Sequence, residues 1–112
     1  MAIRRVFAIW AHPLFGESVR FLLQHPDVEW LGATSNRGDA RAQIMGLRPD
    51  TILLEELEGS RAGEEAIRLL ESISSDVRII RLSLYDNELT IYQREQRTVG
   101  QAEDLLKLIR GE

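Results

Sequence analysis

Hydrophobic and polar positions in the first half of the chain follow a regular alternation of strand and helix patterns. β-Branched and aromatic residues are concentrated in 3–10, 28–34 and 51–54, which predicts three strands. Asn36 stands where its side chain can cap the second of the two intervening helices. The hydrophobic positions at helical spacing are Phe15, Val19, Leu22 and Leu23 in the first helix and Ala40, Ile44 and Leu47 in the second. The predicted order is therefore β-α-β-α-β.

A third helix and a fourth strand follow, and then the pattern changes. Ala66, Ile67, Leu70 and Ile73 mark the helix, and 77–83 is the strand. Strands alternating with helices are typical of a parallel sheet covered on both faces. Only 84–88 separates this strand from the next strand-like run, 89–94, which is too short for a parallel crossover. The fifth strand is therefore expected to return antiparallel.

This return predicts a hairpin with a polar face and an apolar face. With Asp86 and Asn87 as the central turn residues, Leu82 would lie opposite Ile91. The apolar face would then hold Ile80, Leu82, Leu84, Leu89 and Ile91, and the polar face Arg81, Ser83, Thr90, Tyr92 and Arg94. The path of 93–99 is open between a longer strand and a further turn. A last helix from Gln101 to Arg110 would turn Ala102, Leu105, Leu106 and Ile109 inward.

Composition limits the class of protein. A chain of 112 residues with 44% hydrophobic content supports one core, so residues 1–112 are expected to form a single domain. The net charge of −4 argues against binding to nucleic acid, which needs clustered Lys and Arg. No cysteine is present, and neither a run of 18 apolar residues nor a leader is readable. We therefore expect a soluble cytoplasmic protein without membrane contact.

Four stretches of the chain together resemble a bacterial response-regulator receiver domain. They are H-P-L-F at 12–15, H-P-D-V-E-W-L-G-A-T at 25–34, L-R-P-D-T-I-L-L-E at 47–55 and E-D-L-L-K-L-I at 103–109. The resemblance implies an α/β, flavodoxin-like three-layer sandwich with a mostly parallel five-stranded sheet in the order 2-1-3-4-5. The receiver helix between strands four and five is missing here, so the fifth strand is expected to be an antiparallel edge.

The resemblance also implies a phosphorylation site that this chain has lost in most of its parts. Receivers hold Mg²⁺ with an acidic pair, and the matching positions are Trp10 and Ala11, which cannot bind a metal. Glu55 occupies the place of the phosphoacceptor Asp, and Ser83 keeps the hydroxyl that binds the phosphoryl group. The Lys that receivers carry at the end of the fifth strand is absent, because the only Lys in the chain is Lys107. We therefore expect no metal and no cofactor.

Several side chains near this degenerate site have two interpretations. Trp10 either plugs the vacated pocket or stands on the surface as an anchor for a partner. Glu55, Glu56 and Glu58 either hold a cation or are solvated, and Glu55 is also a candidate mimic of a phosphorylated Asp. His12 is interpreted as a capping or packing residue, since the sequence identifies no serine or carboxylate partner for it.

The function expected from these features is non-enzymatic. A receiver-like module would act independently of phosphorylation, through self-association as a homodimer or through docking to a kinase or regulator. Its candidate interface is the uncovered polar face, with Arg81, Thr90, Tyr92 and Arg94. The alternative is an atypical regulator that is phosphorylated on Glu55 or binds a small anion or nucleotide at the carboxyl ends of the strands.

Overall fold

The computed structural model describes residues 3–56, 62–72, 77–83, 88–92, 96–101 and 105–110. Ten helices and strands are assigned within these ranges. In chain order they are β1 (Arg4–Ile9), α1 (Pro13–Leu22), β2 (Val28–Thr34), α2 (Arg37–Leu47), β3 (Thr51–Glu56), α3 (Ala62–Ser72), β4 (Arg78–Ser83), β5 (Glu88–Tyr92), β6 (Gln96–Gln101) and α4 (Leu105–Arg110).

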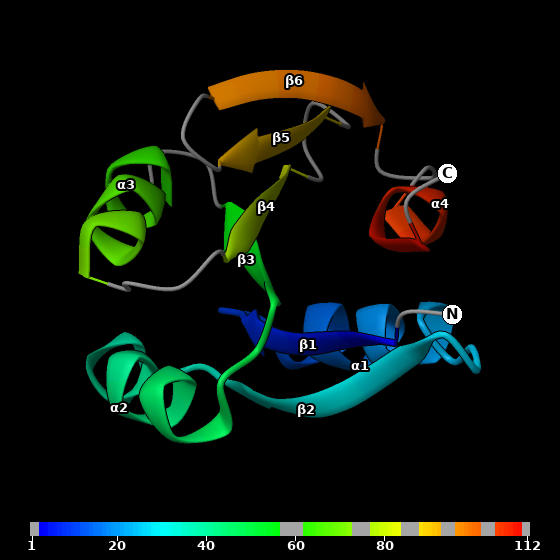
Figure 1. Ribbon diagram of the computed structural model, residues 1–112, viewed down its shortest axis with the longest axis horizontal. Coiled ribbons are helices and arrows are strands. Elements are labelled where there is room, and N and C mark those ends of the chain that lie inside the picture. The colour runs from blue at the N-terminus through cyan, green and yellow to red at the C-terminus, as the bar shows by residue number, and fades with distance from the viewer. Residues whose placement is uncertain are drawn as a thin grey trace.

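The strands form one mixed sheet in the order β2-β1-β3-β4-β5-β6 (Figure 1). β1 pairs in parallel with β2 and β3, and β3 pairs in parallel with β4. β5 returns antiparallel to β4, which confirms the expected order of the first five strands. The expectation that β5 is the edge is wrong, because Gln96–Gln101 turn back and pair antiparallel with it as a sixth strand.

The hairpin of β4 and β5 is offset by two residues from the expected register. Leu82 lies opposite Leu89, not opposite Ile91, and Ile80 takes the place opposite Ile91. The connection spans 84–87, so Leu84, Asp86 and Asn87 lie outside the described residues. Because side chains alternate with a period of two, an offset of two leaves each strand residue on its expected face.

Helices cover both faces of the sheet, as expected for a three-layer sandwich. Figure 1 shows α2 and α3 on one side and α1 and α4 on the other. The first core, on the side of α1 and α4, contains Val6, Ala8, Phe15, Val19, Leu23, Leu53, Ile80, Leu82, Leu89, Ile91, Leu105 and Ile109. The second core, on the side of α2 and α3, contains Phe7, Ile9, Ala40, Ile44, Ile52, Leu54, Ala66, Val77, Ile79 and Tyr92.

Most of the expected inward helix positions are confirmed, with three corrections. Leu22 of α1 and Ile67 of α3 are each 47% exposed, so neither belongs to a core. In α3 the partly buried Leu69 packs against the second core. The last helix begins at Leu105, not at Gln101, because Gln101 ends β6. Leu70 has no described side chain, and Ile73 and Ala102 lie outside the described residues.

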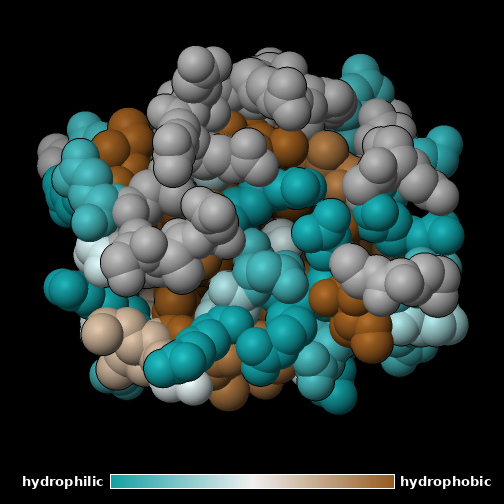
Figure 2. Space-filling model, in the orientation of Figure 1, coloured by the Kyte–Doolittle hydropathy of each residue, from teal (hydrophilic) through white to brown (hydrophobic). Residues whose placement is uncertain are grey.

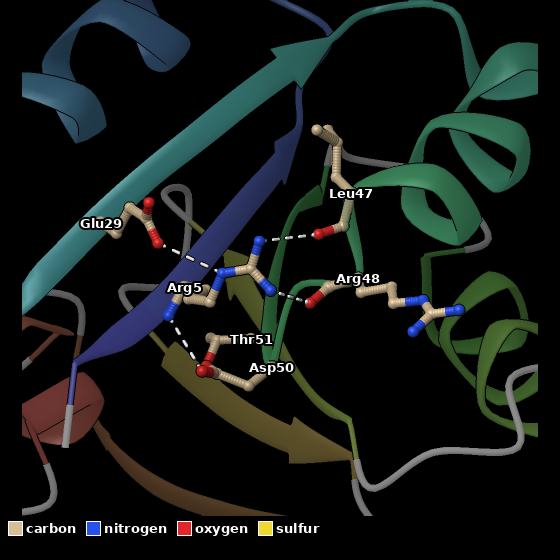
Figure 3. A network of polar contacts seen from close by, with 6 residues as sticks. All are labelled: Arg5, Glu29, Leu47, Arg48, Asp50 and Thr51. Carbon is tan, nitrogen blue, oxygen red and sulfur yellow. Dashed lines mark hydrogen bonds and ion pairs between the residues drawn. The ribbon is translucent and has the colours of Figure 1, made fainter.

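The turns at both ends of α2 are fixed by side-chain hydrogen bonds. Asn36 caps its start as expected, and the Asn36 Oδ1 accepts from the backbone N–H of Gly38 at 2.9 Å. At its end, the Arg5 guanidinium donates to the carbonyl oxygens of Leu47 at 3.0 Å and Arg48 at 2.9 Å (Figure 3). These contacts join the end of α2 to the amino end of β1. The candidate site lies at the opposite edge of the sheet, at the carboxyl ends of the strands.

The surface of the described chain is mixed in polarity. On the face shown in Figure 2, hydrophobic side chains reach the surface in separate groups with hydrophilic side chains between them. The described helices have at most 11 residues. None of the described helices is long and apolar enough to span a membrane.

Candidate functional site

The candidate site lies where β1, β3 and β4 end. Ile9 pairs with Leu54, and Glu55 pairs with Leu82, so the residues that follow β1 and those that end β3 and β4 meet at one edge of the sheet. This edge brings together Trp10, Ala11, His12, Glu55 and Ser83. The parallel pairing of β1, β3 and β4 thus brings Trp10, Ala11, Glu55 and Ser83 to neighbouring strand ends.

Glu55 is a buried carboxylate held by the turn between β1 and α1. The residue is 2% exposed. Its Oε1 accepts the backbone N–H of Ala11 at 2.8 Å and that of His12 at 3.2 Å. Its Oε2 lies 2.8 Å from the Nδ1 of His12. Because an ionised carboxylate only accepts hydrogen bonds, the Nδ1 of His12 is the donor in this contact. Both oxygens are therefore engaged by the turn.

The partner of His12 was missed by the sequence interpretation. His12 is the N-cap residue of α1, as the capping interpretation expected, but its side chain makes no capping hydrogen bond. Its imidazole instead pairs with Glu55 while its side chain stays 65% exposed. The signal for this pair was present in the sequence. His12 follows the first strand, Glu55 lies next to the last residue of the third, and neighbouring parallel strands bring their carboxyl ends together.

Trp10 fills the space beside the start of α1. Its indole ring lies so close to Gly16 that a Cβ on that residue would be 3.0 Å from the Trp10 Cδ1 and 3.1 Å from the Nε1. The residue is partly buried and packs against the first core. Its backbone N–H donates to the carbonyl of Thr34 at 3.0 Å. The ring therefore packs against both α1 and the first core, while the residue as a whole is only partly buried.

Ser83 is buried at the end of β4 without a hydrogen-bond partner. The residue is 1% exposed, and its Oγ makes no hydrogen bond within the part of the chain that the structure describes. The Ser83 backbone lies opposite Glu56 in the sheet register. Burial of a hydroxyl without a hydrogen-bond partner is unfavourable by about 1–3 kcal/mol.

The polar face of the hairpin is packed inside the molecule. Arg81 forms an ion pair with Glu56 at 3.1 Å and donates to the Oγ1 of Thr90 at 3.2 Å. Its guanidinium lies 5.7 Å from the centre of the Tyr92 ring. Thr90 is 0% exposed and Tyr92 2%. The expectation that this face is uncovered is therefore wrong for Ser83, Thr90 and Tyr92.

Two parts of the structure explain this burial. α3 packs against β4 and β5, and β6 continues the sheet beyond β5. Burial is also the largest cause of the raised pKa of Tyr92, with the Glu56 carboxylate adding to the rise and the Arg81 guanidinium opposing it. Arg94, the remaining candidate of this face, lies outside the described residues.

The acidic residues at and beyond the end of β3 do not converge on one point. Glu55 reaches the turn before α1, whereas Glu56 reaches Arg81 on the other face of the sheet. Glu58 lies outside the described residues. Among the described side chains, no group of three or more His, Asp or Glu residues is placed to hold a metal ion.

The strand order and the layers define a receiver-like fold. A solved structure of similar fold is a mutant form of the anti-anti-sigma factor PhyR from Bartonella quintana. The two structures align with a TM-score of 0.62 and 15% sequence identity, over 74% of this chain and 35% of that chain. The chain thus spans about a third of that protein. No family model and no curated protein matches the sequence.

Proposed function

We propose that this protein is a cytoplasmic, receiver-like signalling module that acts by binding another protein and does not depend on phosphorylation. The single observation that carries this proposal is the state of Glu55. The resemblance to receivers assigns its carboxylate to the phosphoacceptor position, yet this carboxylate accepts two backbone N–H groups and pairs with His12. A group that anchors a neighbouring turn in this way serves as structure and is poorly placed to act as a nucleophile.

The residues around Glu55 support the same proposal. Phosphoryl transfer in receivers depends on a hard cation, which prefers oxygen ligands. The side chains at the positions of the acidic pair are an indole and a methyl group, and the indole of Trp10 packs against Gly16. Ala11 contributes only its backbone N–H, which it donates to Glu55. An amide donor at this point favours an anion and repels a cation.

The fold comparison supports a regulatory role. The solved protein of similar fold is named as an anti-anti-sigma factor, which is a regulator. By analogy, we propose that the present chain also acts through contact with a protein partner, either a second copy of itself or another regulator. The buried polar face of the hairpin is not available for this contact, since Thr90 and Tyr92 are enclosed.

One observation favours the alternative function. The Ser83 hydroxyl has no partner within the described chain, and the corresponding hydroxyl in receivers contacts the phosphoryl group. An orphan hydroxyl near the carboxyl ends of the strands would suit a small anion. The carboxylate of Glu56, however, lies on the same face of the sheet, opposite Ser83 in the register, and its negative charge opposes anion binding there.

A phosphorylation assay separates the two candidates. The full chain is incubated with Mg²⁺ and a small acyl phosphate, and its intact mass is measured. A receiver domain that carries the acidic pair and the Asp serves as the positive control. The proposed function predicts that the mass of this chain stays unchanged. A stable added phosphoryl group that disappears in the Glu55→Gln variant would establish the alternative.

A further inference from the structure

Helix α1 presents large hydrophobic side chains to solvent. Leu14 and Phe21 are each 76% exposed. Seven residues make about two helical turns, so these two side chains lie on one face of the helix. The opposite face carries Phe15, Val19 and Leu23 into the first core. α1 is therefore hydrophobic on both sides, whereas the outer face of a surface helix is ordinarily polar.

Charged residues flank this outer stripe on one side. Glu17 and Arg20 are exposed and lie between Leu14 and Phe21 along the helix. Within the described part of the chain, neither Glu17 nor Arg20 makes an ion pair. The stripe thus has a hydrophobic residue at each end and one charge of each sign between them. Read in the opposite direction along the helix, the order of the two charges is reversed.

We infer that α1 binds α1 of a second copy of this chain, in antiparallel orientation about a twofold axis near residues 17 and 18. This inference rests on the proposed function and identifies its partner and surface. In this arrangement Leu14 meets Phe21 of the second copy, and the same contact recurs across the axis. Glu17 and Arg20 of the second copy then lie on the same side of the helix pair. Their positions differ by two residues along the helix axis, which is a rise of about 3 Å.

Charge complementarity selects a second copy as the occupant. A uniformly acidic partner would be repelled by Glu17, and a uniformly basic one by Arg20. A complementary partner surface carries a hydrophobic stripe flanked by one positive and one negative charge in the reverse order along the helix. The α1 helix of a second copy, in antiparallel orientation, has this pattern. α1 lies over β1 and β2, toward the end of the sheet that is opposite to β6 (Figure 1). Its outer face is therefore not covered by α4.

Two charge-reversal variants test this inference by sedimentation equilibrium of the full chain. Glu17→Arg places like charges at both contacts of a homodimer, and so does Arg20→Glu. Each variant alone is expected to weaken self-association at least tenfold relative to the unmodified chain. An equimolar mixture of the two is expected to recover it, because the arginine introduced in one variant would then face the glutamate introduced in the other across the axis. If a substitution weakened self-association only by changing the structure of its own chain, mixing the two variants would not restore it.

A hydrophobic substitution and a matched control complete the test. Phe21→Ser is expected to weaken association at least tenfold, and Met45→Ser, at a 61% exposed residue of α2, is expected to leave it unchanged. Circular dichroism establishes that every variant is folded. A dimer that persists in all α1 variants, or a mixture that does not recover self-association, would overturn the inference that α1 is the interface. Either result would leave the proposed function unaffected. A chain that is monomeric at high micromolar concentration would overturn the inference, and the phosphorylation assay would still decide the proposed function.

Discussion

The Oε2 of Glu55 lies 2.8 Å from the Nδ1 of His12, and the Oε1 of the same carboxylate accepts the backbone N–H of Ala11 at 2.8 Å. A residue on β3 thereby holds the turn that connects β1 to α1. In a receiver this edge of the sheet would place acidic side chains around a cation. Here the buried Glu55 carboxylate instead forms hydrogen bonds with the donors of the turn between β1 and α1.

Removing the Glu55 carboxylate is expected to destabilise the fold. Glu55→Ala leaves the two backbone N–H groups of Ala11 and His12 without their acceptor, which is expected to lower the free energy of unfolding by about 2–3 kcal/mol. His12→Ala keeps both backbone contacts and removes a largely exposed imidazole, so its expected effect is below about 1 kcal/mol. Urea unfolding measures both. Equal effects for the two variants would contradict the anchoring role of Glu55.

The contact between Trp10 and Gly16 predicts an unusual effect of a helix-favouring substitution. Gly→Ala inside a helix ordinarily stabilises by about 0.5–1 kcal/mol. At Gly16 the new Cβ would lie 3.0 Å from the indole, so Gly16→Ala is expected to give no gain or a loss of about 1 kcal/mol. Gly46→Ala, in α2, has nothing within 4 Å and is expected to show the ordinary gain.

A double-mutant cycle assigns the Gly16 effect to the indole. In a Trp10→Ala background, Gly16→Ala is expected to recover most of the helix-propensity gain, because the contact is gone. Thermal unfolding followed by circular dichroism supplies the four stabilities. If Gly16→Ala stabilises the protein as much as Gly46→Ala with Trp10 in place, the ring does not pack against α1.

Arg81 and Ser83 are expected to respond in opposite ways to truncation. Arg81→Ala leaves the largely buried Glu56 carboxylate without its ion pair, and the expected loss is about 2–4 kcal/mol. The Ser83 Oγ has no partner within the described chain, so Ser83→Ala is expected to be neutral or to stabilise by up to about 1 kcal/mol. Guanidinium unfolding at neutral pH measures both. A clear loss of stability in Ser83→Ala would mean that its hydroxyl has a function in the fold.

Tyr92 predicts how stability changes at high pH. Its pKa is raised above the ordinary 10.0, chiefly by burial. The folded state therefore retains the phenol proton more strongly than the unfolded state, and stability falls as the pH rises above 10. Tyr92→Phe is expected to reduce this fall. Absorbance titration of tyrosinate checks the cause, because the chain has only Tyr85 and Tyr92, and the late-titrating phenol should disappear in the variant.

The sequence was sufficient to predict the layers and the order of the first five strands. These follow from hydrophobic periodicity and from the short connection after β4, which are local properties of the chain. The register of the hairpin was predicted two residues off, since the sequence does not reveal that Ser83 pairs with Glu88. β6 was left open because Gln96–Gln101 carry little hydrophobic signal.

The contacts of the candidate site could not be predicted from the sequence. Trp10, Ala11, Glu55 and Ser83 lie at the ends of neighbouring strands. The pairing of Glu55 with His12 depends on tertiary approach between segments 43 residues apart. The polar appearance of Thr90 and Tyr92 was misleading, because Arg81 satisfies Thr90 and lies over the Tyr92 ring inside the protein.

The most direct test of the central claim is the response of the Ala11 and His12 amide resonances to Mg²⁺ and beryllofluoride, a phosphoryl mimic. The chain is labelled with ¹⁵N, and its two-dimensional spectrum is recorded with and without both reagents. If Glu55 is permanently engaged by the turn, both amide signals keep their positions. Saturable shifts of these two signals on addition of the reagents would show that the carboxylate is free to accept a phosphoryl group, and would contradict the account.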